Sequence, residues 1–224
     1  MNRVFQNLIL CLVLFAYSKN SFAESTNKAI KIACIGDSIT FGYLVKNREE
    51  NSYPALLQKE LGEAFEVLNF GVPSKTVLRS NGKSIQPYVS TPTYKKALEI
   101  KADIILVMLG ANDSKPNNWN TGKKQFKKDF EYLIQSLKSK RSTVIWCIPT
   151  SIQNNLQPMA KNLNEIIEQE KVIAEKLGLP FIDLHSPTKS KPALFIDGLH
   201  PNKKGCELIS KIIAKEIKKA PIKK

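Results

Sequence analysis

Five short apolar runs lie along the chain, and each is bounded by residues that favour turns. The runs are rich in Ile, Val, Leu and Phe, and their length suits strands better than helices. Because they are apolar at consecutive positions, they are typical of parallel strands buried on both faces. The predicted strands are residues 29–35, 65–70, 103–109, 143–148 and 179–184.

Apolar residues recur at helical spacing between these runs. The pattern is clearest in residues 124–137, where Phe126, Phe130, Ile134 and Leu137 fall on one face of a helix. The same spacing predicts helices over residues 53–61, 159–177 and 203–217, and a shorter helix over residues 93–100.

Strands that alternate with helices indicate βαβ units, which build a parallel sheet with helices on both faces. The predicted fold class is therefore α/β, a three-layer α/β/α sandwich around a five-stranded parallel sheet. In such folds ligands bind at the carboxyl ends of the strands. The residues that directly follow each strand are the candidates for chemistry.

The N-terminus departs from this pattern. Residues 1–3 carry a positive charge, residues 8–16 are an unbroken apolar run, and Ser-Phe-Ala at 21–23 suits a signal peptidase. The apolar run is too short to span a bilayer, which needs about 20 residues. We expect residues 1–23 to be a signal peptide and residues 24–224 to form one domain. The mature protein would be exported, periplasmic or secreted, without stable membrane insertion.

The formal net charge of +14 raises the question of a polyanionic partner. The lysines are scattered along the whole chain, and no basic run is interleaved with aromatic residues. This pattern favours a solvated basic surface over nucleic-acid binding. A polyanionic substrate at a cell surface stays open, and the sequence does not determine the oligomeric state.

Three cysteines lie beyond the predicted signal peptide, Cys34, Cys147 and Cys206. The first two fall in strand-like runs, where a small buried hydrophobic residue is the usual interpretation. At most one disulfide can form, and the sequence does not say which. No cysteine or histidine spacing indicates a metal site, so no metal is expected.

Four polar motifs that contain glycine lie at the ends of predicted strands or at the start of a helix. Taken singly, each is also an ordinary turn or helix cap. Together, the carboxyl edge of a parallel sheet would collect them in one crevice. They are Gly36-Asp37-Ser38, Asn69-Phe70-Gly71, Gly110-Ala111-Asn112-Asp113 and Asp197-Gly198-Leu199-His200-Pro201.

This set of motifs resembles the blocks of the SGNH, or GDSL-type, hydrolases, which centre on Ser, Gly, Asn and His. The resemblance spans nearly the whole predicted domain and implies the flavodoxin-like SGNH hydrolase fold and a serine esterase. By this comparison Ser38 is the nucleophile, and Asp197 and His200 complete a catalytic triad. The oxyanion hole would consist of the backbone N–H groups of Ser38 and Gly71 and the side-chain amide of Asn112.

The chemistry of these residues agrees with the comparison. A serine hydroxyl needs an adjacent base, and the chain has two histidines, His185 and His200. Asp197 lies three residues before His200, close enough to orient its ring, and the family pattern Asp-x-x-His-Pro falls there. His185 stays open as the alternative base. Acyl transfer by this mechanism needs no cofactor.

One departure from the family follows the second strand. The chain reads Gly71-Val72-Pro73-Ser74, whereas many relatives have Ser-Gly after the corresponding Gly-Val. Pro73 has no N–H and stiffens the turn, so the comparison does not give the shape of this loop. Gly71 remains the expected donor.

Four loops are expected to build the substrate site, and Trp119 in one of them could stack on a sugar face or anchor its loop. The loops are residues 43–52, 74–92, 114–122 and 150–158. No long apolar stretch suggests a lipid tunnel, and the segment from Gly110 to Trp119 is similar to bacterial carbohydrate O-acetylesterases of the sialate type.

The expected function is therefore hydrolysis of an acyl ester, most simply an acetyl ester, of a carbohydrate, and the expected partner is a small-molecule or glycan ester substrate. Within the same superfamily the alternatives are a lysophospholipase or a thioesterase. In another class, the alternative is a non-catalytic carbohydrate-binding module that keeps the fold.

Overall fold

The computed structural model describes residues 28–79, 85–139 and 141–219. The predicted signal peptide, residues 1–23, lies outside the described residues. Five parallel strands form one sheet in the order β2-β1-β3-β4-β5. They are β1 (Ile30–Gly36), β2 (Phe65–Gly71), β3 (Ile104–Met108), β4 (Thr143–Ile148) and β5 (Phe181–Asp183).

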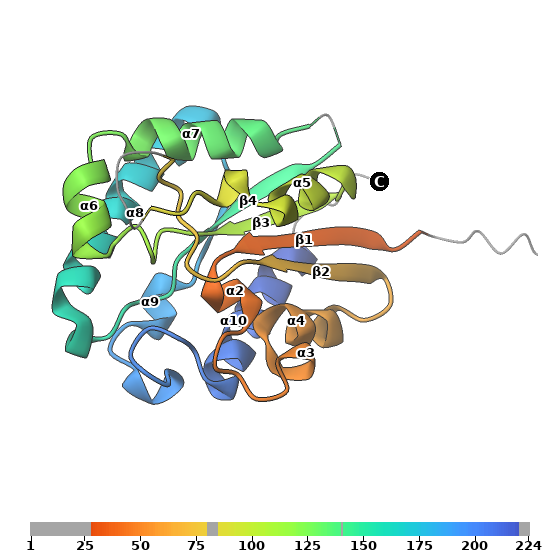
Figure 1. Cartoon of the computed structure of the whole chain (residues 1–224). Coiled ribbons are helices and arrows are strands. Elements are labelled where there is room, and N and C mark those ends of the chain that lie inside the picture. Colours follow the sequence, from red (N-terminus) through yellow and green to blue (C-terminus); the bar gives the residue numbers. More distant parts are fainter. Residues whose placement is uncertain (1–27, 80–84, 140, 220–224) are drawn as a thin grey trace, which may run out of the picture.

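Helices cover both faces of the sheet, which confirms the predicted three-layer α/β/α architecture (Figure 1). One face carries α5 (Pro92–Glu99), α7 (Phe126–Leu137) and α8 (Gln157–Leu177). The opposite face carries α4 (Tyr53–Leu61) and α10 (Lys203–Lys219). Four short helices lie in connections: α2 (Ser38–Phe41), α3 (Arg48–Asn51), α6 (Pro116–Gly122) and α9 (His185–Thr188).

Each face of the sheet has its own core because successive side chains of a strand point to opposite faces. In β1, Ala33 and Ile35 enter the core under α7 and α8, whereas Ile32 and Cys34 enter the core under α4 and α10. All four are fully buried. Burial of one such aliphatic side chain contributes about 1.5–3 kcal/mol, so the apolar runs stabilise the sheet from both sides.

Strand β2 is one of the two edge strands of the sheet and is half-buried, which differs from the prediction of burial on both faces. The side chain of Gln58 on α4 hydrogen-bonds to its backbone. Gln58 Oε1 accepts the Val67 N–H at 2.8 Å, and Gln58 Nε2 donates to Phe65 O at 3.0 Å. These two bonds tie α4 to the edge strand.

Helix α6 lies in residues 114–122, where a loop was expected. Apart from Pro116, which suits the first turn of a helix, its residues are weak helix formers, so the sequence pattern did not show it. Trp119 is 2% exposed, its ring lies 5.5 Å from that of Phe126, and its Nε1 donates to Glu165 Oε2 at 3.0 Å. Trp119 therefore anchors this segment, and its burial rules out stacking on a sugar.

The three cysteines beyond the predicted signal peptide, Cys34, Cys147 and Cys206, are all free and buried, so no disulfide joins them.

In the part of the chain that the structure describes, no helix is both long enough and apolar enough to cross a bilayer.

The core predicts how two matched leucine substitutions differ. Leu106 in β3 is fully buried, whereas Leu98 on α5 is 41% exposed. We expect Leu106→Ala to lower the free energy of unfolding by about 2–5 kcal/mol because it leaves a cavity. Leu98→Ala should change it by less than about 0.5 kcal/mol. Urea unfolding followed by circular dichroism measures both, and equal losses would contradict this core.

Candidate active site

Ser38 begins α2 directly beyond the end of β1, at the carboxyl edge of the sheet (Figure 1). Asp37 caps this short helix, because its Oδ1 accepts the Ile39 N–H at 2.9 Å. The chain thus changes from strand to helix within two residues, between Gly36 and Ser38. Ser38 is 7% exposed.

Three side chains that are far apart in the sequence form a hydrogen-bonded series at this edge. Ser38 Oγ lies 3.0 Å from His200 Nε2, and His200 Nδ1 lies 2.7 Å from Asp197 Oδ2. The other carboxyl oxygen of Asp197 accepts the backbone N–H groups of Leu199 at 3.0 Å and His200 at 2.8 Å. One carboxylate therefore holds both the ring and the backbone of His200.

The environment of Asp197 keeps this carboxylate charged. Partial burial alone would raise its pKa, but hydrogen bonds from the backbone and ring of His200 outweigh that effect and lower the pKa below its ordinary value. A charged carboxylate beside the imidazole stabilises the imidazolium that forms when the ring accepts a proton. The series can therefore draw the proton from the Ser38 hydroxyl.

His185, the alternative base, has other partners at the start of α9. Its Nδ1 lies 3.3 Å from Pro149 O, and its backbone N–H donates to Asp183 Oδ1 at 2.9 Å. Burial lowers the pKa of its ring. The structure thus brings His200 to the hydroxyl of Ser38 and places His185 in a loop contact.

Asn112, the expected amide donor, lies beyond the end of β3 and is buried. Its Nδ2 donates to Lys75 O at 3.1 Å, which uses one of the two amide hydrogens. The second hydrogen has only a 3.5 Å contact with Asp37 Oδ2, at the outer limit for a hydrogen bond. Asn112 therefore keeps one donor that a ligand could use.

Asp37 and Asp113 are buried carboxyl groups that hold the loops around these residues. Asp113 accepts the backbone N–H groups of Val77 at 3.1 Å and Leu78 at 2.8 Å, which fixes the loop after β2. Burial raises the pKa of Asp37 to about 7 and that of Asp113 to about 6. Both act as anchors for backbone rather than as partners of the histidine.

Gly71 departs from the expectation that its N–H faces the oxyanion. That N–H already donates to Asn69 Oδ1 at 2.8 Å, so a ligand would have to compete for it. A side chain at Gly71 would collide with the backbone of Phe41. Glycine is needed here because the end of β2 packs closely against α2.

Ser74 is a residue that sequence reasoning missed. Its φ of 64° is left-handed, a conformation that favours glycine, and many relatives carry Gly at this position. The Val72 N–H donates to Gly36 O at 3.0 Å, and Lys75 O accepts from Asn112, so Ser74 lies between the strand of the nucleophile and Asn112. Among the described residues no acceptor takes the Ser74 N–H. The replacement of the family's Gly by Ser was the signal in the sequence.

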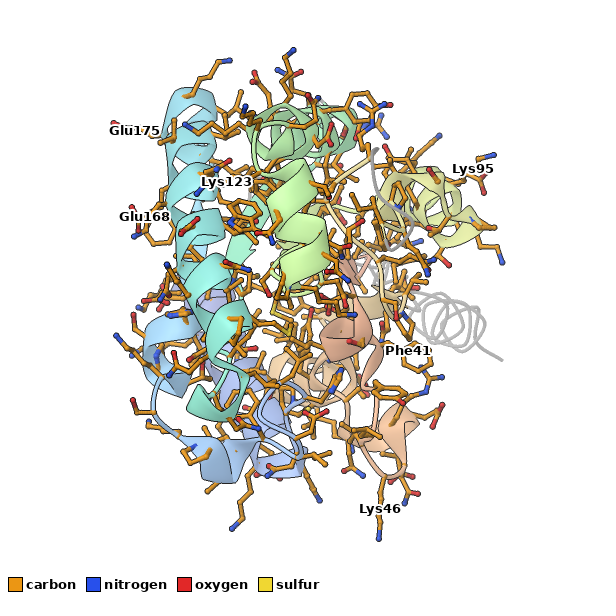
Figure 2. The ribbon with its side chains drawn as sticks, turned by 60° about the vertical axis from the view of Figure 1, so that its left-hand side comes forward. Phe41, Lys46, Lys95, Lys123, Glu168 and Glu175 are labelled. Atoms are coloured by element: carbon orange, nitrogen blue, oxygen red, sulfur yellow. The ribbon has the colours of Figure 1, made fainter. Side chains whose placement is uncertain are left out.

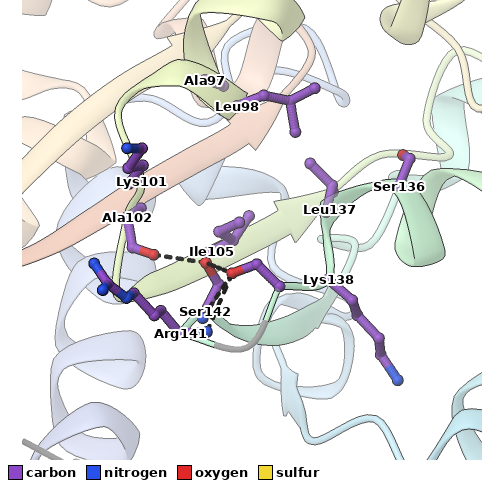
Figure 3. Close-up of a pocket in the computed structure, with 11 residues that line it drawn as sticks. Ala97, Leu98, Lys101, Ala102, Ile105, Ser136, Leu137, Lys138, Arg141 and Ser142 are labelled. Carbon is purple, nitrogen blue, oxygen red and sulfur yellow. Dashed lines mark hydrogen bonds between the residues drawn. The ribbon is translucent and has the colours of Figure 1, made fainter.

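A pocket of about 430 Å³ lies elsewhere on the molecule (Figure 3). It opens at the amino ends of β3 and β4, where Ser142 Oγ donates to Ala102 O at 2.7 Å. This is the end of the sheet opposite to Ser38, so the pocket is separate from the candidate site. Within residues 28–79, 85–139 and 141–219, no three His, Cys, Asp or Glu side chains are grouped to hold a metal ion.

A buried carboxyl group also lies beneath the third motif. A Cβ placed on Gly110 would lie 3.5 Å from Glu170 Oε1, and the Glu170 side chain is fully buried. In the described part of the chain neither carboxyl oxygen has a hydrogen-bond partner of standard geometry. Burial, and secondarily the charge of Asp113, raise the pKa of Glu170 well above its ordinary value.

Comparison with known proteins identifies a matching family and a related enzyme. The model of the GDSL-like lipase/acylhydrolase family matches residues 34–208. An acetylxylan esterase of Xylanibacter ruminicola is 36% identical to the chain over 216 residues. The match covers 85% of this chain and 43% of that protein, so the chain spans less than half the length of this relative.

Solved structures resemble the whole described domain. The native aryl esterase of M. smegmatis has a TM-score of 0.71 at 17% identity, with 85% of this chain and 99% of that chain covered. Est24, a carbohydrate acetylesterase from Sinorhizobium meliloti, has a TM-score of 0.69 at 17% identity, with 84% and 98% covered. At these identities the likeness shows the fold.

The position of Glu170 predicts a pH dependence of stability. Because its pKa is raised in the folded state, the folded chain keeps a proton that the unfolded chain loses above its ordinary pKa. This proton contributes its whole stabilisation at a pH below the pKa that Glu170 has in the unfolded chain. The contribution is lost as the pH rises through the pKa that Glu170 has in the folded chain. We expect Glu170→Gln to remove part of the decline in the urea midpoint between pH 5 and pH 8.

Glu168→Gln is the matched control for this measurement, because Glu168 lies on the same helix and points outward (Figure 2). Its substitution should leave the pH dependence as in the wild type. A Glu170→Gln variant with the wild-type pH dependence would show that this carboxyl does not hold its proton.

Proposed function

The chain belongs to the GDSL-like lipase/acylhydrolase family and is a carboxylic ester hydrolase, and from this premise we propose that it removes acetyl groups from a carbohydrate. The observation that carries the proposal is the series from Ser38 Oγ to His200, 3.0 Å, and from His200 to Asp197, 2.7 Å. The name of the 36% identical relative supports acetylated xylan as the class of substrate.

In the proposed first half-reaction, Ser38 Oγ attacks the ester carbonyl carbon while its proton passes to His200 Nε2. Asp197 keeps the ring in the tautomer that can accept this proton and stabilises the imidazolium. The bond between the acyl carbon and the sugar oxygen then breaks, and His200 returns the proton to that oxygen. The products are acetyl-Ser38 and a free sugar hydroxyl.

In the second half-reaction, water replaces the sugar. His200 takes a proton from the water as it attacks the acetyl carbon, and then returns a proton to Ser38 Oγ as the acyl bond breaks. Acetate leaves, and the enzyme regains its starting state. These steps are completed by the side chains of this chain, and none of them calls for a cofactor.

We assign the developing oxyanion to three donors: the backbone N–H groups of Ser38 and Ser74, and the amide hydrogen of Asn112 whose contact with Asp37 Oδ2 is long, 3.5 Å. The Ser38 N–H lies in the first turn of α2, where backbone donors have no acceptor within the helix. Ser74 replaces Gly71 in this assignment because the Gly71 N–H is held by Asn69. Loss of one such donor typically lowers turnover by about 10²–10³.

We also propose that the enzyme works outside the cytoplasm, in the periplasm or as a secreted protein. The support is the sequence of residues 1–23, with its charged start, apolar run and small residues before the cleavage point. Charged side chains such as Lys95 on α5 and Glu175 on α8 point outward from their helices (Figure 2). A solvated surface of this kind suits a soluble glycan ester and calls for no nucleic-acid partner.

The substrate class predicts the outcome of a panel of esters. The chain without residues 1–23 should release acetate from acetylated xylo-oligosaccharides with a higher kcat/KM than for lysophosphatidylcholine or palmitoyl-CoA. Ser38→Ala should lower kcat by about 10⁴-fold or more, because the nucleophile is lost. A preference for the long acyl chains would instead indicate the lysophospholipase or thioesterase activity, and a wild type as inactive as Ser38→Ala would indicate a non-catalytic module.

The two histidines provide a matched pair for the assignment of the base. His200→Ala should lower kcat on the acetylated sugar by about 10³-fold or more, because Ser38 then lacks its proton acceptor. His185→Ala should leave kcat within about threefold of the wild type, since this ring contacts Pro149 rather than Ser38. Similar losses in the two variants, with both folded by circular dichroism, would refute the choice of His200.

A further inference from the structure

Exposed apolar side chains gather on the two loops that carry the nucleophile and the base. Tyr43 is 47% exposed, Leu44 is 47% exposed and Ile196 is 49% exposed. A single exposed hydrophobic residue needs no explanation. These three follow Ser38 or precede His200 by a few residues in the sequence, and we call them the apolar rim; grouped exposed apolar side chains mark binding surfaces.

Backbone hydrogen bonds fix this rim to the catalytic residues. The Tyr43 N–H donates to Ser38 O at 2.9 Å, and the Ile196 N–H donates to His200 O at 2.8 Å. The rings of Tyr43 and His200 lie 5.0 Å apart at an interplanar angle of 62°, an edge contact. Tyr43 therefore contacts the proposed base directly while almost half of its side chain stays open to solvent.

Leu44 adds an observation on the backbone of the same loop. Its φ is 65°, in the left-handed region that leucine rarely adopts. Strained residues of this kind persist where the surrounding structure holds them, and they cluster at binding and catalytic sites. The chain thus keeps two apolar side chains at the rim in spite of an unfavourable conformation.

The direction of proton transfer places the leaving alcohol beside Tyr43. In the proposed reaction His200 Nε2 must come within hydrogen-bond distance of the leaving oxygen, about 2.6–3.2 Å. The alcohol that carries this oxygen is therefore next to the imidazole, whose ring is in contact with Tyr43. A sugar ring has an apolar face of C–H groups, and an aromatic ring is the side chain best suited to cover it.

We propose that Tyr43 determines specificity for the alcohol part of the ester by packing its ring against the apolar face of the acetylated sugar. Leu44 and Ile196 flank this contact. The inference rests on the proposed function, because it names the side chain that recognises the substrate of that site. A purely structural role as support for His200 would affect all esters alike, whereas a contact with the alcohol affects only esters whose alcohol reaches the ring.

The test compares Tyr43→Ala and Tyr43→Phe on two acetyl esters. One is an acetylated xylo-oligosaccharide, and the other is ethyl acetate, whose alcohol is too small to cover the ring. Tyr43→Ala should raise KM for the sugar ester roughly 5- to 10-fold more than it raises KM for ethyl acetate, because the aromatic contact with the alcohol is lost from the sugar ester only. Tyr43→Phe keeps the ring and should resemble the wild type on both.

Two further variants keep the test decisive. Tyr132 is a tyrosine on α7 that is 44% exposed. Tyr132→Ala should leave KM and kcat/KM for both esters as in the wild type. In a Ser38→Ala background, calorimetric titration with the acetylated xylo-oligosaccharide should show the same 5- to 10-fold weakening when Tyr43→Ala is added. This second measurement depends on binding and not on turnover.

The outcomes separate the inference from the proposed function. If the wild type hydrolyses the sugar ester and Tyr43→Ala leaves its KM unchanged, the sugar contact is wrong and the proposed function stands. If Tyr43→Ala lowers kcat equally on both esters, Tyr43 only positions His200. A wild type that hydrolyses ethyl acetate but not the acetylated sugar would overturn both.

Discussion

The register of β1 with its two neighbours is the constraint on which the candidate site depends. Gly36 pairs with Gly71 in β2 and with Met108 in β3, so the three central motifs leave the sheet at one level. Ser38, Ser74 and Asn112 follow these ends by only a few residues, and Asn112 hydrogen-bonds to Lys75, the neighbour of Ser74. A shift of one residue in the pairing would turn every side chain of a strand to the opposite face. Core packing and the placement of the nucleophile are therefore set by the same backbone hydrogen bonds.

Most polar groups near the nucleophile stabilise loops, and few remain for a substrate. Asp113 holds the backbone of Val77 and Leu78, and neighbouring Asn112 holds Lys75, so one turn after β3 secures residues 75–78 of the segment after β2. These bonds are formed in a buried setting, where loss of a partner leaves an unsatisfied group and is costly. The donors that remain free are thereby held in position before any ligand arrives, which is the condition for electrostatic stabilisation of a developing charge.

The sequence predicted the elements whose signal is local and failed where tertiary contacts decide. Residues 53–61 and 143–148 were predicted with the bounds that α4 and β4 have, because apolar periodicity reports directly on burial. The edge position of β2 and the helix α6 depend on which elements pack together, and no local pattern records that. Among the site residues, the motifs located Ser38, Asp197 and His200, which the structure brings together. The motif also named Gly71 as a donor, but it could not record that the Gly71 N–H donates to Asn69 Oδ1, because that bond depends on how the chain turns after β2.

The side chain of Gln58 has a consequence beyond the attachment of α4. An edge strand offers unpaired backbone groups on which a strand from a second molecule can add, and repeated addition leads to aggregates. Gln58 occupies the N–H of Val67 and the carbonyl of Phe65, two neighbouring positions that such an incoming strand would require. Because Gln58 belongs to the same molecule, its amide competes with an incoming strand for these two backbone groups. An incoming strand would have to displace this amide before it could pair with this part of β2.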